Sequence, residues 1–176
     1  MNIHPIFVHF PIALLTIYAI LELLRFKKIK NQTYWFYVKA VFVIFGSLGT
    51  FVALATGDSA AYNVLSYDKT MRPLISTHET FADLTTIIFA LIAAGYLISW
   101  CNKENFGRFF IGKKFIEKFW LVTLRLSYFF VETRFVILLA LVGLFAVTIT
   151  GGLGGVIVYG SNADPFFGVI YKLFFQ

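Results

Sequence analysis

The sequence has little cysteine, little proline and few charged residues. A single cysteine, Cys101, excludes an intramolecular disulfide framework and a cysteine-based metal cluster. Charged residues make up 14% of the 176-residue chain, whereas soluble domains have about 25%. Hydrophobic residues account for 59%, and the mean hydropathy is +0.80. With four prolines and no Pro-rich or Gly/Ser-rich tract, there is no sign of a flexible linker. The composition predicts an integral membrane protein.

The positive charge does not indicate nucleic-acid binding. The formal net charge is +6, but most basic residues gather in two short stretches between apolar runs. Such clusters set the orientation of membrane proteins. When the first stretch is extended to Lys39 and the second to Arg134, the two stretches contain all Lys and Arg residues except three. These three, Lys69, Arg72 and Lys172, are expected on the opposite side of the membrane. The positive-inside rule then predicts that both termini lie outside the cytoplasm, which for a protein of the bacterial inner membrane is the periplasmic side.

The apolar runs predict an all-α membrane protein, a single domain over residues 1–176 built as an up-down bundle of four transmembrane helices. Each run is long enough to approach the thickness of a bilayer. The predicted spans are residues 5–24, 38–56, 78–100 and 135–150, with interfacial helices at 119–131 and 165–176. The basic run 25–30 follows the first span, and the glycine-rich run 151–155 ends the fourth. Ser76 and Glu79 have the spacing of a capping box that would start the third span.

The three histidines are the main candidates for function. His4 and His9 lie at the start of the first span, and His78 opens the third. In an up-down bundle these two spans sit diagonally across the core, so His9 and His78 are expected at one depth, facing each other. Two neutral imidazoles in this geometry are typical axial ligands of a b-type haem iron. Gly46, Gly49 and Gly152 would leave room for the flat ring.

Other interpretations remain open for the polar residues. His4 is about 140° around the helix from His9, which predicts that only one of them faces a shared ligand; His4 would be a solvated interfacial residue or a propionate contact. Glu79 would be a cap, while Asp83, inside the third span, would orient a histidine or relay a proton. Two or three histidines with Asp83 or Glu79 could instead bind zinc or copper, although no H-x-x-x-H pair is present.

At these residues the chain resembles a family of small bacterial membrane proteins of unknown function. Members open with H-P-x-x-V-H-F-P-I-A-L-L, as residues 4–15 do here, and have a histidine opening a later span, as His78 does. Their last span ends in T-G-H-x-G-G-x-L-V-Y-G, which compares with residues 150–160. Two positions depart from this pattern: Gly152 replaces the histidine of T-G-H, and Glu79 stands where an arginine is expected.

The resemblance implies electron transfer near the outer face, since some relatives are fused to planctomycete-type cytochrome c domains. Together with the histidines it predicts a haem b electron-transfer subunit, itself non-catalytic, of a respiratory or photosynthetic oxidoreductase complex. Its partners would be the lipid bilayer, other membrane subunits, and a cytochrome c or a quinol-oxidising protein. The alternatives are a cofactor-free accessory subunit and a periplasmic-side metal or proton handler that uses Asp83.

Overall fold

The computed structural model describes residues 4–24 and 32–176, and all secondary structure in these ranges is helical. The basic run 25–30 lies outside the described residues. The α-helices are α1 (His4–Leu23), α3 (Thr33–Tyr67), α4 (Arg72–Lys103), α5 (Lys114–Glu132), α6 (Phe135–Tyr159) and α7 (Pro165–Phe175). Two short 3-10 helices, η1 (Lys69–Met71) and η2 (Phe106–Phe110), precede α4 and α5.

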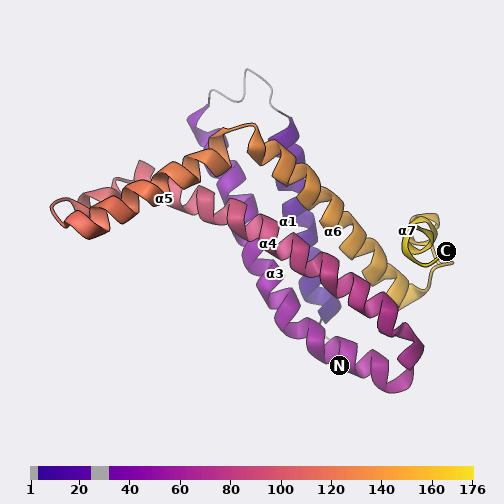
Figure 1. The fold of residues 1–176 in the computed structure, drawn as a ribbon. Coiled ribbons are helices and arrows are strands. Elements are labelled where there is room, and N and C mark those ends of the chain that lie inside the picture. Colours follow the sequence, from indigo (N-terminus) through magenta and orange to yellow (C-terminus); the bar gives the residue numbers. More distant parts are fainter. Residues whose placement is uncertain (1–3, 25–31) are drawn as a thin grey trace.

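Four of these helices are long and apolar enough to cross a membrane: α1, α3, α6, and α4 together with η1. Helix α1 packs against α3 and α6, and α4 packs against the same two helices. Helices α1 and α4 therefore lie on opposite corners of a four-helix arrangement (Figure 1). The prediction of an all-α membrane bundle is confirmed.

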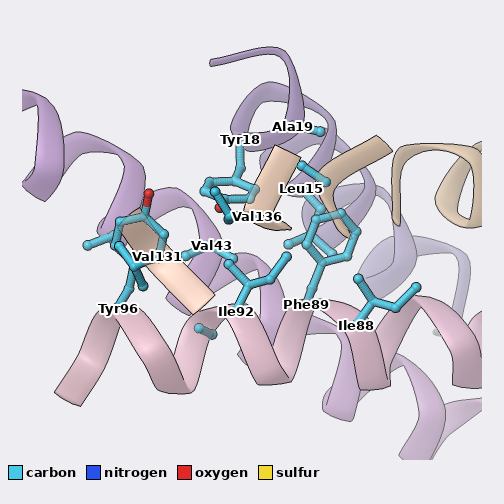
Figure 2. Packing of buried hydrophobic residues seen from close by; sticks show 13 residues of the cluster. Leu15, Tyr18, Ala19, Val43, Ile88, Phe89, Ile92, Tyr96, Val131 and Val136 are labelled. Atoms are coloured by element: carbon cyan, nitrogen blue, oxygen red, sulfur yellow. The ribbon is translucent and has the colours of Figure 1, made fainter. Parts of the chain in front are cut away.

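Large aromatic side chains fill the middle of the bundle. Tyr18 of α1 lies edge-on to Phe89 and Tyr96 of α4, with ring centroids 6.1 and 5.9 Å apart. Leu15 and Ile92 complete this layer, and none of the five residues has exposed surface (Figure 2). Aromatic edge-to-face contacts of this kind add to the packing of the buried rings. This buried layer lies between the two ends of the four-helix bundle.

Helices α3 and α4 are longer than the apolar runs predict. Helix α3 continues to Tyr67 and has 35 residues, or about 50 Å at ~1.5 Å per residue. Asp68 ends it and caps η1 by accepting the Thr70 N–H, and α4 begins at Arg72 with Pro73 in its first turn. Ser76 therefore lies inside α4, and the predicted capping box was wrong. Proline at a helix start, rather than the Ser76 hydroxyl, marks this N-terminus.

The glycine-rich run does not end the fourth span. Residues 151–155 are helical, and α6 continues to Tyr159. Neighbouring side chains pack closely against several of these glycines, which stabilises the helix despite its poor intrinsic propensity. Helices are present near both predicted interfacial segments, as α5 and α7. Their position at a membrane interface remains a prediction.

Candidate functional site

A cavity of about 770 Å³ opens at the end of the bundle where α1 and α4 begin. The C-terminal halves of α3 and α6 complete its walls. The extra turns of α3 beyond Gly57 contribute Ala60, Ala61 and Val64, so the unexpected length of this helix deepens the cavity. His4, His9 and His78 all line it, as do three carboxylates, Asp58, Glu79 and Asp83.

His78 is held by the backbone of α6. Its Nδ1 lies 3.0 Å from the carbonyl oxygen of Thr150. A carbonyl only accepts hydrogen bonds, so Nδ1 carries the proton, and the lone pair of the neutral ring is on Nε2. A Cβ on Gly154 would lie 3.3 Å from the His78 Cε1, which is a tight contact. The small residue at position 154 therefore makes space for the imidazole.

His9 has the same arrangement on α1. Its Nδ1 donates to the carbonyl oxygen of Pro5, one turn earlier in the helix. The neutral ring therefore also has its lone pair on Nε2. The side chain is exposed at the cavity rather than enclosed by neighbouring helices. Histidines that bind metals commonly donate their second ring nitrogen to a backbone carbonyl in this way.

His4 is tied to α3 instead. Its Nδ1 lies 2.9 Å from the Thr56 hydroxyl, which itself approaches the carbonyls of Val52 and Ala53 at 3.1 and 3.0 Å. The hydroxyl proton is thus used by α3, and the Thr56 oxygen accepts from His4. His4 is half-buried. Both His4 and His9 line the cavity, and the expectation that only one of them faces a shared ligand stays a prediction.

The carboxylates do not complete a metal site. Glu79 and Asp83 are exposed and line the cavity. The capping role predicted for Glu79 was wrong, because Ser76 lies inside α4. Among residues 4–24 and 32–176, no group of three or more His, Cys, Asp or Glu side chains is arranged to hold a metal ion. The geometry therefore gives no support to the zinc or copper alternative.

The three glycines expected beside the cofactor lie elsewhere. A Cβ on Gly46 would come within 2.6 Å of Leu15, and one on Gly49 within 3.2 Å of Pro11, so both glycines serve the contact between α1 and α3. Gly152 faces α7, where a Cβ would lie 2.8 Å from Ile170. The glycines that line the cavity are Gly57, Gly151, Gly154 and Gly155. Close helix packing, rather than room for a ligand, accounts for Gly46, Gly49 and Gly152.

A buried polar cluster at the other end of the bundle was not predicted. The Glu22 carboxylate accepts hydrogen bonds from the Lys39 ammonium at 2.7 Å and from the Tyr96 hydroxyl at 3.1 Å. These residues come from α1, α3 and α4. The signal was an acidic residue near the end of one apolar run and a basic residue near the start of the next, since ionisable groups in spans are costly unless paired.

The fold and the cavity define a multi-pass membrane protein with a histidine-lined site at one end. The chain belongs to the family described as "Predicted membrane protein (DUF2231)", which matches residues 1–163. Helix α7 begins just beyond the matched residues. Comparison with curated proteins and with solved structures gives no match.

Proposed function

We propose that this protein is a b-type haem subunit that transfers electrons at the histidine end of the bundle, where His9 and His78 would hold the haem iron. One observation carries the proposal. Both imidazoles line the same cavity, and each donates its Nδ1–H to a backbone carbonyl. The lone pair of each neutral ring is then on Nε2, the nitrogen that a haem iron would bind.

The residues around the histidines are compatible with such a group. The cavity volume of about 770 Å³ lies within the ~300–1,000 Å³ typical of cofactor sites. Its walls are mostly apolar, with Leu15, Ile75 and Val147 among the lining residues, and a dry wall favours a hydrophobic macrocycle. A bound haem would supply one-electron chemistry. The chain itself would provide two iron ligands. The hydrogen bonds from Nδ1 would keep each imidazole in the tautomer whose Nε2 is basic.

The distribution of basic residues bears on the orientation of the protein in the membrane and on its electron partner. We propose an inner-membrane location with both termini in the periplasm, because all but three of the 15 Lys and Arg residues belong to the two stretches of sequence that follow the first and third predicted spans. The cavity would then face the periplasm. A subunit of 20.0 kDa that consists mainly of four candidate spans is expected to work within a larger assembly. A cytochrome c or a quinol-oxidising protein would be its electron partner.

The test is a reduced-minus-oxidised optical spectrum of protein produced with ample haem. We expect the α-band of a low-spin b haem in the natural chain and its loss in His9→Ala and in His78→Ala. Thr77→Ala is a matched control, because Thr77 is next to His78 and its hydroxyl bonds only the Pro73 carbonyl of its own helix among the described residues. The control is expected to retain the band. A folded natural protein without the band would overturn the proposal and favour the cofactor-free accessory subunit.

Proton handling is a second candidate, supported by Asp83. This carboxylate lines the cavity from within a membrane span, and the part of the chain that the structure describes gives it no hydrogen-bond or ion-pair partner. Ionisable groups in such positions commonly mark proton pathways. In liposomes, Asp83→Asn would abolish a proton flux that Thr77→Ala leaves intact. No flux above that of empty liposomes would exclude this candidate.

A further inference from the structure

Helix α5 forms an arm beside the four-helix bundle. It turns back along the end of α4 and projects away from α1, α3 and α6 (Figure 1). Ser99 and Ser127, both buried, are 3.2 Å apart across the two helices, and Asn102 donates to the Tyr128 hydroxyl at 3.1 Å. A Cβ on Gly95 would lie 3.1 Å from Val131. The arm is therefore docked on α4 through one defined face.

The opposite face of α5 is apolar and largely exposed. The docked face has Leu124, Ser127 and Val131. About 180° away, a second stripe repeats at alternating intervals of four and three residues. It consists of Phe115, Phe119, Val122, Leu126 and Phe129. These side chains are between 49% and 85% exposed, with Phe115 the most exposed. A helix with apolar residues on both faces buries the second face against something outside this chain.

Basic residues border the exposed stripe. Lys114, Lys118 and Arg125 fall on one side of it, at about 60–100° from the centre of the stripe. Lys113 and Arg108 precede the helix, and Arg134 follows it. Glu117 is directed to the docked side, and its carboxylate accepts the Gly112 N–H at 3.3 Å. The exposed Glu132 falls on the same side as Lys114, so the border carries three cations and one carboxylate of α5 and is net cationic.

We infer that the arm lies on an anionic lipid surface, with the stripe in the acyl region and the bordering cations at the lipid phosphates. An apolar face flanked by Lys and Arg is the pattern of helices that lie in the plane of charged membranes. Each cation near such a surface is worth roughly a fivefold gain in partitioning. A second copy of this chain fits less well, because pairing two stripes would bring two rows of Lys114, Lys118 and Arg125 together.

Spin labelling of the full-length protein in nanodiscs tests the inference. Cys101 is first replaced by serine, and a nitroxide is attached at Val122→Cys, in the middle of the stripe. Its accessibility to oxygen, which concentrates in lipid, is compared with that to a water-soluble nickel chelate. We expect a label exposed to oxygen and shielded from nickel in nanodiscs containing phosphatidylglycerol. With phosphatidylcholine alone, or after Lys114, Lys118 and Arg125 are changed to glutamine, the nickel accessibility is expected to rise severalfold.

The control neutralises three other cations, Lys69, Arg72 and Lys172, which lie outside the arm. This variant is expected to behave like the natural sequence. A label exposed to nickel in every bilayer would overturn the inference. Equal insertion in neutral and anionic bilayers would also overturn it, since the cations would then have no role. Shielding from both reagents with dipolar broadening between labels would show that a second copy covers the stripe.

Discussion

Glu22 and Lys39 form an ion pair of 2.7 Å in which the glutamate has no exposed surface. The pair joins α1 to α3, and the Tyr96 hydroxyl adds α4 at 3.1 Å from the same carboxylate oxygen. Three of the four long helices thus meet at one oxygen, at the end away from the histidines. Removing one member of a buried pair takes away compensation from the charge that stays buried, which is more costly than removing both.

We therefore expect Lys39→Met to destabilise the protein by about 3–5 kcal/mol. Glu22→Gln/Lys39→Met is expected to cost less than Lys39→Met alone, because the glutamine keeps an acceptor for Tyr96 and no charge is left. The measurement is the free energy of unfolding in mixed detergent, followed by circular dichroism. An unchanged midpoint in Lys39→Met would mean that the pair contributes nothing.

Gly143 is predicted to be required for the contact between α6 and α4. A Cβ at this position would lie 2.7 Å from the Phe89 Cζ, and Phe89 is fully buried and cannot move aside. We expect Gly143→Ala to cost about 1–3 kcal/mol through overpacking. Gly151→Ala on the same helix is the control, since its Cβ would only reach Ile12 at 3.7 Å. The control is expected to be neutral or to gain up to ~1 kcal/mol from helix propensity.

Asp68 is predicted to make the turn between α3 and α4 sensitive to acid. Its Oδ1 accepts the Thr70 hydroxyl at 2.6 Å and the Thr70 N–H at 2.9 Å. These bonds, the hydroxyl first, lower the pKa of Asp68 from its usual value. Their stabilisation is therefore complete above the unfolded pKa of about 3.9 and is lost as pH falls through the lower folded pKa.

The measurement for this turn is hydrogen-exchange protection of the Thr70 amide between pH 6 and pH 3, compared at each pH with the intrinsic exchange rate. Protection is expected to fall below about pH 4 in the natural chain. Asp68→Asn is the control, because asparagine keeps the acceptor oxygen but does not titrate. If both proteins lose protection in parallel, another group is responsible.

Hydropathy predicted the fold well because burial in lipid decides which segments are helical. It failed at the helix ends, where local signals take over. Asp68 and Pro73 set the ends of α3 and α4, and both signals were readable in the sequence. The spacing of Ser76 and Glu79 is that of a capping box, and only the start of α4 at Arg72 shows that both residues lie inside the helix. Capping motifs indicate a helix start only where the chain leaves the helix.

The candidate site was predicted as a set of residues rather than as a geometry. Ionisable groups are costly in an apolar chain, which identified His4, His9 and His78 as candidates. All three line one cavity. The sequence could not say which glycines border it, because that depends on how α6 is rotated between α4 and α7. Gly152 and Gly154 are two residues apart, yet one faces Ile170 and the other faces His78. The rotation comes from tertiary packing.

Gly152 is predicted to determine whether α7 docks. A Cβ there would lie 2.8 Å from Cγ1 of Ile170, which is buried and branched and cannot swing away. We expect Gly152→Ala to release α7, seen as a loss of hydrogen-exchange protection over residues 165–175, with the four long helices still protected. Gly151→Ala, one residue away, should leave α7 protected. Loss of protection throughout the protein in Gly152→Ala would instead mean that α7 and the bundle unfold as one unit.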